Sequence, residues 1–467
     1  MRLFPVITVL ALSACTVGPN FSAPKTAAPA AYLPAGETAP TTSAPTGPSA
    51  DWWSLFQSEP LNQMVDAAVG GNLSLQAENF RLAAAREAVT AATGQLYPQA
   101  SASGSIGRSE INLANYGFPG PNPVVDFYSL GPSVSYALDV FGGTHRQIET
   151  LAARAEAQQL QLATARLILS GQIVTDATGI AAARGELAAL NDIVANDEKN
   201  LDLVRTAQNA GRSTEVDVLS AKSQLAQDRT LLPPIRAQWS VARHALAVLT
   251  GQQPGVWMPP DFDLSDFRLP AQFPLVVPSA LVHQRPDILA AEADLHAASA
   301  QIGVATAALY PSITISAFFS QGTTDPSLFF SGAKSGWNFG AGLTAPLFEG
   351  GTLRANRRAA VDQYNAAFAT YRQTVLQAFG QVADGLTALG DDNDELAEQA
   401  DALDAATHSL ALVRESYQAG ESGILQVLDA QRQYQQARLG LVRAQAARLD
   451  DTIALLVATG SAWRPGS

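Results

Sequence analysis

Cysteine and methionine are nearly absent from this chain of 467 residues, and charged side chains are scarce. Cys15 is the only cysteine, so the chain cannot form an intramolecular disulfide. Met1, Met64 and Met258 are too few for a relay of thioether ligands that would carry copper(I). Charged residues make up 15% of the chain, and the net charge of −13 argues against a nucleic-acid surface. The negative net charge fits a channel that favours cations, and it also fits a protein that is merely kept in solution by its charge.

The patterns of enzyme active sites are missing as well. The chain has neither a glycine-rich phosphate loop with lysine and serine or threonine nor a nucleophile elbow. Its five histidines are scattered and lack metal-ligand spacing with carboxylates: His145, His244, His283, His296 and His408. We therefore expect neither an enzyme nor a bound metal or cofactor.

The amino terminus has the pattern of a cleaved leader. Arg2 precedes an apolar run at 3–12, which is shorter than the ~20 residues of a membrane-spanning helix. Cys15 follows small residues, the position of the acylated cysteine in bacterial lipoprotein signals. We expect a signal peptide at 1–14, lipidation of Cys15 and a proline-rich tether at 15–50. By resemblance to such lipoproteins, Thr16 at the second mature position directs the protein to the outer membrane.

The rest of the chain is a tandem duplication with an offset of 209 residues. Ala210-Gly211 recurs as Ala419-Gly420, and Thr250-Gly251 recurs as Thr459-Gly460. Both copies carry an apolar ladder with steps of seven: Ile173, Ile180, Leu187, Val194 and Leu201, then Val361, Phe368, Val375, Val382, Leu389, Leu396, Leu403 and Leu410. The second ladder spans about 74 Å at ~1.5 Å per residue, which predicts long helices that pack as coiled coils.

Each copy is expected to contain a helix, two strands, a very long helix, a glycine break and a returning helix. The first repeat would occupy 51–251, with helices at 60–94, 143–208 and 213–249. The second would occupy 278–460, with helices at 278–309, 351–418 and 423–458, after a linker at 252–277 and before a tail at 461–467. Pro233-Pro234 should kink or split the first returning helix.

Three segments alternate between apolar and small polar residues, at about 129–141, 312–321 and 336–347, whereas a fourth expected strand at about 99–108 is mostly serine, glycine and alanine and alternates poorly. This alternation fits strands of a transmembrane barrel or of a half-buried soluble sheet, and the lipoprotein signal favours the barrel. Four strands leave two open edges, which a bilayer does not tolerate, so several chains must share one barrel. Two chains would give eight strands and a filled interior, whereas three would give twelve strands and a channel.

Several motifs resemble the outer membrane factor family of TolC-like exit ducts, in its lipoprotein branch serving multidrug efflux. They are the segment Cys15 to Phe21 with Pro24, Trp52-Trp53 with Phe56 and Pro60-Leu61, Arg285-Pro286-Asp287-Ile288 with Ala291-Glu292 and Ile302-Gly303, Tyr310-Pro311, and Pro346 to Gly351. The resemblance implies a mainly α-helical, duplicated protomer. It further implies a homotrimer with a twelve-stranded β-barrel in the outer membrane, continued by an α-helical coiled-coil barrel in the periplasm.

The helix breaks are the candidate functional sites. Leu425 and Asp429 lie one turn apart on the second returning helix and resemble the apolar and acidic rings that constrict the periplasmic tip in this family. Tyr417 matches an aromatic residue that braces the tip, and Asp217 is a further acidic candidate at the first break. Asp429 is alternatively an ordinary exposed carboxylate. The acidic run at 391–395 is a solvated helix face or a ring that lines the duct.

The sequence therefore predicts a passive outer membrane duct for small toxic compounds, with a periplasmic adaptor and an inner-membrane pump as partners. A duct for secreted polypeptides is the alternative with the same architecture. A coiled-coil lipoprotein spacer without a pore is the alternative of another class.

Overall fold

The computed structural model describes residues 16–25, 29–34, 51–117, 119–269, 278–329 and 335–460. The expected signal peptide, Cys15, most of the tether and the tail at 461–467 lie outside these residues, as does part of the expected linker. The chain forms two compact units. The sheet unit comprises Arg81–Gln158, Ala290–Tyr371 and the residues up to Pro24, and the hairpin unit comprises the remainder.

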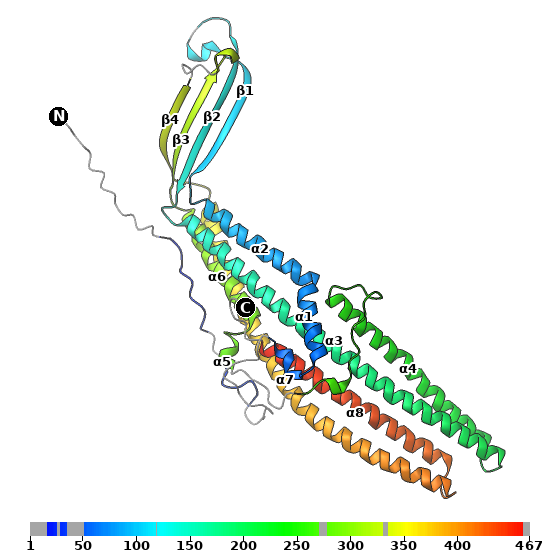
Figure 1. Ribbon diagram of the computed structural model, residues 1–467. Coiled ribbons are helices and arrows are strands. Elements are labelled where there is room, and N and C mark those ends of the chain that lie inside the picture. The colour runs from blue at the N-terminus through cyan, green and yellow to red at the C-terminus, as the bar shows by residue number, and fades with distance from the viewer. Residues whose placement is uncertain are drawn as a thin grey trace. The chain divides into compact units, whose positions relative to one another are not determined.

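The sheet unit contains one antiparallel sheet of four strands in the order β1-β2-β3-β4 (Figure 1). The strands are β1 (Gln99–Glu110), β2 (Val124–Leu138), β3 (Ser312–Thr323) and β4 (Ser335–Thr344). The strand pair of the first copy joins that of the second through β2 and β3, where Val134 pairs with Ala317. Within the described chain β1 and β4 each have a strand on one side only.

The register places most of the apolar residues of the four strands on the same face, whereas Val125, Phe127 and Phe318 lie on the other. Tyr136 pairs with Ile315, which pairs in turn with Ala341, and Ala317 pairs with Phe339. The apolar residues of this face are largely uncovered, including Ile106, Trp337, Phe339 and Leu343. On the opposite face serine hydroxyls pair across the strands, as in the contact of 2.7 Å between Ser105 Oγ and Ser129 Oγ.

The largest differences in extent from the segments expected from sequence are those of β2 and β4, whereas β1 and β3 each extend two residues further than expected. β2 begins at Val124 instead of near 129, because its first residues pair with the end of β1. It ends at Leu138 because the Asp139 carboxylate accepts hydrogen bonds from Thr144 N (3.0 Å) and His145 N (2.9 Å) at the start of the next helix. β4 ends at Thr344 instead of near 347, where Pro346 lacks an N–H for the ladder.

Each copy opens with two helices instead of the single helix expected. The first copy contains α1 (Glu59–Gly71) and α2 (Leu73–Gly94), and the second contains α5 (Pro278–Leu281) and α6 (Pro286–Ala307). Asn72 separates the first pair, since its amide donates to Leu249 O (2.8 Å) and its side-chain oxygen caps Leu75 N (3.0 Å). Short 3₁₀ helices lie at η1 (Trp52–Phe56), η2 (Leu113–Tyr116), η3 (Leu264–Asp266) and η4 (Pro326–Leu328).

The predicted long helices are confirmed. They are α3 (Gly143–Asn209) with its returning helix α4 (Glu215–Leu249), and α7 (Thr352–Gln418) with its returning helix α8 (Ile424–Thr459). The heptad phase is also confirmed, because every residue of the two ladders except Phe368 is buried or half-buried within the single chain. The ladder of α3 is fully buried at Ile173 and Ile180, and that of α7 at Val382 and Leu389.

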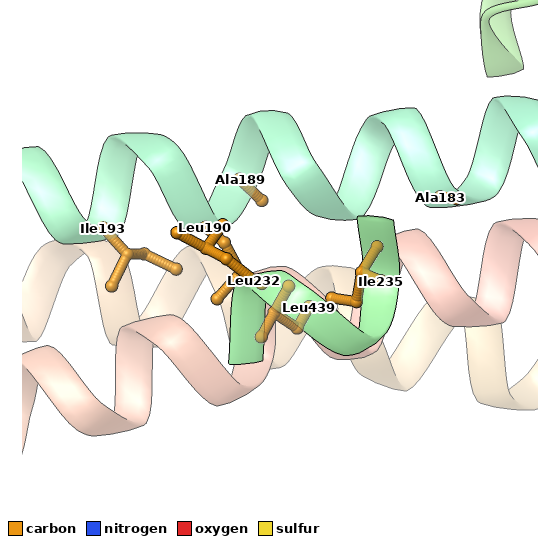
Figure 2. Packing of buried hydrophobic residues seen from close by; sticks show 7 residues of the cluster. All are labelled: Ala183, Ala189, Leu190, Ile193, Leu232, Ile235 and Leu439. Atoms are coloured by element: carbon orange, nitrogen blue, oxygen red, sulfur yellow. The ribbon is translucent and has the colours of Figure 1, made fainter. Parts of the chain in front are cut away.

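Of the expected kink or split at Pro233-Pro234, the split is wrong, since α4 continues through both prolines. Figure 2 shows the buried side chains that hold α4 on either side of the two prolines. Leu232 and Ile235 of α4 are buried in a cluster with Leu190 of α3 and Leu439 of α8, which we call the α3–α4–α8 cluster. Tertiary packing here outweighs the loss of two helical N–H donors.

Among the described helices, we find none with both the length and the apolar character needed to cross a bilayer.

Candidate functional site at the tips of the hairpins

Both long helices end in the same hydrogen-bonded turn. At the end of α3, Arg212 N donates to Ala207 O (2.8 Å) and Gly211 N donates to Gln208 O (2.8 Å). This pair of bonds is a Schellman motif, in which the residue after the helix adopts a left-handed conformation. Gly211 supplies that conformation with φ of 72°.

The end of α7 repeats the motif 209 residues later. Glu421 N donates to Ser416 O (2.9 Å), and Gly420 N donates to Tyr417 O (3.0 Å). Gly420 has φ of 80°, where an L side chain is strained. The two breaks predicted from Ala-Gly pairs are therefore turns of defined geometry rather than loose loops.

Gly420→Ala should lower the stability of the hairpin tip by about 1 kcal/mol, because alanine is strained at this left-handed position. A Cβ at Gly420 would meet open space, so the effect would come from the backbone alone. Gly390→Ala is the matched control: Gly390 lies inside α7 with open space around it, and alanine there should raise helix stability by about 0.5–1 kcal/mol. Thermal unfolding followed by circular dichroism should shift in opposite directions; a common direction would contradict a backbone origin of the effect.

The returning helices begin with different caps. Thr214 and Asp217 form a complete capping box on α4, in which Asp217 N donates to Thr214 Oγ1 and Thr214 N donates to Asp217 Oδ2 (2.8 Å). Hydrogen bonds from the Thr214 backbone and hydroxyl and from the Ser213 hydroxyl lower the pKa of the Asp217 carboxyl. On α8 the equivalent cap has one side-chain bond, from Gly423 N to Gln426 Oε1 (2.6 Å).

The two gate candidates of α8 lie on its exposed face. Leu425 is 61% exposed, and the Asp429 side chain is 57% exposed, while Val427 and Leu428 between them are buried. The structure adds a cation that sequence reasoning missed, since Arg432 Nη1 lies 3.5 Å from Asp429 Oδ1. Its position three residues after Asp429 on a helix was the signal that could have identified it.

Tyr417, the aromatic candidate, is half-buried at the end of α7. It packs against a cluster of buried residues that joins α3, α4 and α8 at the tips: Leu201, Val204, Ala221, Leu225, Ile424, Val427 and Leu428. Asp217, by contrast, lies at the first tip, where its carboxylate is used by the capping box. The tips therefore have a buried apolar interior, and their exposed surface carries apolar as well as polar side chains, Leu425 and Val216 among them.

The acidic run at 391–395 is not a uniform solvated face. Its other members are exposed, but Asp392 is only 8% exposed. Burial, together with the nearby Asp451 carboxylate, raises the pKa of Asp392 to about 6, while Arg448 opposes the shift. Heptad phase accounts for the burial of Asp392, because this residue lies three positions after Leu389 and four before Leu396, and the charged Arg448 of α8 enters the same seam.

Three of the histidines contact carboxylates singly: His145 lies 2.6 Å from Asp139, His296 lies 2.9 Å from Glu149, and His408 lies 3.4 Å from Asp404. Within the described ranges no three histidine, cysteine, aspartate or glutamate side chains form a group that could hold a metal ion.

The fold and both halves of the sequence are similar to known proteins. The family model described as outer membrane efflux protein matches residues 64–252 and 277–461. The pyoverdine export outer membrane protein OpmQ of Pseudomonas aeruginosa is 31% identical over 420 residues, which cover 88% of this chain and 87% of that protein. The outer membrane protein OprJ of the same species is 28% identical, with 99% of this chain and 96% of that protein covered.

Among solved structures, the outer-membrane channel OprN is similar with a TM-score of 0.89 at 28% identity. The match covers 97% of this chain and 100% of that one. Because the family model matches both copies and the likeness to OprN extends over the sheet and the hairpins alike, the chain belongs to the outer membrane efflux protein family, as an outer membrane channel of tripartite efflux that extends into the periplasm.

Proposed function

We propose that three copies of this chain close a shared twelve-stranded barrel and form a passive exit duct for small toxic compounds. The observation that carries this proposal is the sheet, which among the described residues has two open edges and one largely uncovered apolar face. A bilayer can cover the apolar face, but it cannot satisfy the backbone groups of an open edge. Pairing β1 of one chain with β4 of the next would satisfy both edges.

The periplasmic entrance of this duct would be closed at the hairpin tips. Leu425 would supply an apolar ring and Asp429 an acidic ring, with each residue repeated three times around the axis. Tyr417 would brace α7 against the tip cluster, and Asp217 would act indirectly by fixing the start of α4. These roles are supported by the exposure of the first two side chains and by the packing and capping contacts of the other two.

The cargo and partners follow from the class of relatives. Relatives are named for pyoverdine export, for antibiotic efflux and for toluene efflux, so their cargo consists of small molecules. For the present chain we infer a small-molecule cargo delivered by an inner-membrane pump through a periplasmic adaptor. The chain itself would consume no energy and would need no cofactor.

The amino terminus would add a lipid anchor. Cys15 is proposed as the acylated first residue of the mature protein, after removal of 1–14. Mass spectrometry of the amino-terminal peptide tests this directly. An acylated peptide that begins at Cys15 is expected, and an unmodified peptide that begins elsewhere would remove lipidation from the proposal.

The duct is tested with the purified full-length protein. Native mass spectrometry should detect three chains per particle, and planar bilayers should show discrete conductance steps. A conducting monomer would contradict the shared barrel, and a trimer without conductance would favour a structural spacer. Restored resistance to small toxic compounds in a strain that lacks its own exit duct, together with the matching pump and adaptor, would distinguish efflux from polypeptide secretion.

A further inference from the structure

Two carboxyl groups meet in the interior of the hairpin unit. Asp197 of α3 is 2% exposed and Asp228 of α4 is 4% exposed, and their side chains are close enough to share a hydrogen bond. The two aspartates are not a feature of the repeated unit, because the equivalent positions of the second copy are Ala406 and Ala437. Burying carboxylates costs free energy unless each oxygen finds a donor or the group keeps a proton.

The donors around this pair leave one oxygen without a partner. Gln431 donates to Asp197 Oδ1, Gln435 donates to Asp228 Oδ1 (2.6 Å), and Gln224 donates to Asp228 Oδ2 (2.9 Å). Asp197 Oδ2 is buried and accepts no hydrogen bond from the described residues. A single proton on this oxygen, donated to the neighbouring Asp228 carboxylate, would complete the network.

The charged groups around the pair cannot replace this proton. Arg414 of α7 attracts the charge of Asp197, but desolvation and the adjacent Asp228 outweigh it and raise the pKa of Asp197 to about 8. From α8 the facing side chains are the neutral amides of Gln431 and Gln435. Asp429 and Arg432 of α8 lie on its exposed face and pair with one another.

The same amides connect the carboxyl pair to the candidate gate. Gln431 also accepts a hydrogen bond from Asn200 Nδ2 of α3, so α8 is tied to α3 immediately after Asp429. We propose that Asp197 and Asp228 share one proton, and that losing it as the pH rises loosens α8 from α3 and α4 and favours opening of the gate. The step to the gate rests on the proposed duct function, whereas the loosening does not.

The direction follows from proton linkage. The closed network keeps its proton up to about pH 8, whereas a hydrated aspartate releases it near pH 4, since its ordinary pKa is about 3.9. The closed arrangement therefore binds more protons than the loosened one between these values. Its stability is fully present in acid and is lost progressively as the pH rises through this range.

Hydrogen exchange of the α8 backbone in the full-length protein tests the loosening. Asp197→Asn removes the charge and supplies an N–H to the unpartnered position. Comparing parent and variant at the same pH cancels the intrinsic pH dependence of exchange. For the backbone amides around Gln431 and Gln435, we divide the protection factor of the variant by that of the parent. This ratio should increase about a hundredfold from pH 5.5 to pH 8. The same ratio at both pH values would overturn the proposal.

Two further variants test whether the pH dependence belongs to this pair. Asp228→Asn replaces the other member of the pair and should reduce the pH dependence in the same way, so a folding defect in one variant leaves the other as the test. Asp202→Asn removes an exposed carboxylate from the same helix, and it should leave the ratio close to one at both pH values. A pH-dependent ratio in Asp202→Asn equal to that of the buried pair would contradict a specific shared proton.

Conductance separates this inference from the proposed function. Parent channels should open more readily at pH 8 than at pH 5.5, and Asp197→Asn channels should lose most of this difference. If the exchange ratio changes while the conductance of working channels does not, the coupling to the gate is wrong. If no form of the protein conducts, the duct is wrong and the exchange result stands by itself.

Discussion

Replacing Leu425 and Asp429 together by alanine should leave an assembled trimer whose conductance in planar bilayers exceeds that of the parent about tenfold, since apolar constrictions close pores by excluding water. Three carboxylates about 8 Å apart repel by roughly 0.5 kcal/mol per pair in water, and by more in a narrow constriction. Arg432, 3.5 Å from Asp429, offsets part of this repulsion. The repulsion already weakens the closed tip. Truncating both rings to alanine should then open it without harming assembly, because the constriction becomes wider and loses its apolar side chains.

The matched control uses the same positions of the first copy. Val216 and Ser220 stand where Leu425 and Asp429 stand in the second copy, and Val216 is comparably exposed. Their double replacement by alanine should change conductance little. If the two double variants conduct alike, or if the first conducts no better than the parent, the constriction lies elsewhere in the duct.

Leu190→Asp should abolish the folded hairpin unit. Leu190 is fully buried in the α3–α4–α8 cluster, with Leu232 and Leu439 beside it (Figure 2). Removing the leucine side chain alone would cost about 2–5 kcal/mol, and burying an unpaired carboxylate would add several more. Far-ultraviolet circular dichroism should show loss of the cooperative helical transition, and size-exclusion chromatography should show loss of the trimer.

Leu190→Met separates charge from shape at the same site. Methionine keeps nearly the same volume and the apolar character, so its cost should stay below about 1.5 kcal/mol and the trimer should survive. Normal assembly of Leu190→Asp would mean that this cluster does not hold the three helices together.

The sequence predicted those parts of the fold that depend on repetition. The heptad positions Ile180 and Leu389 are buried as expected, and the Ala-Gly pairs end the long helices. These features depend on local periodicity and on one glycine conformation, which a single sequence displays. The alternation of small and apolar residues likewise predicted the shared apolar face of the sheet, which the strand register confirms.

Features that depend on contacts between distant segments were not predicted. The break at Asn72 combines a local cap on Leu75 N with a contact between the Asn72 side chain and Leu249 O, and no pattern near Asn72 predicts the second contact. The continuity of α4 through its two prolines depends on packing against α3 and α8. The Asp197–Asp228 pair was missed for the same reason, since heptad phase says which face is buried but not which polar groups meet there.

The sequence identified the residues of the candidate site but not the hydrogen bonds and the ion pair that these residues form. Leu425 and Asp429 were identified by their resemblance to the constriction rings of the family, on residues one helical turn apart after the glycine break. Arg432 was overlooked, although it lies on the same helix three residues later. The capping bonds of Asp217 were also not predicted, because a carboxylate near a helix start has the same sequence pattern whether it caps the helix or faces a pore.

The unequal caps of the returning helices have a mechanical consequence. The first turn of α4 is fixed by the reciprocal bonds of Thr214 and Asp217, whereas α8 starts from Gly423 with a single side-chain bond. In a ring of three chains, the α3–α4 tips, which the capping box holds, would alternate around the circumference with the α7–α8 tips, which are held less firmly. A partner that pressed equally on all the tips would therefore displace mainly the α7–α8 tips, which carry Leu425 and Asp429. The α3–α4 tips would keep their positions in the ring.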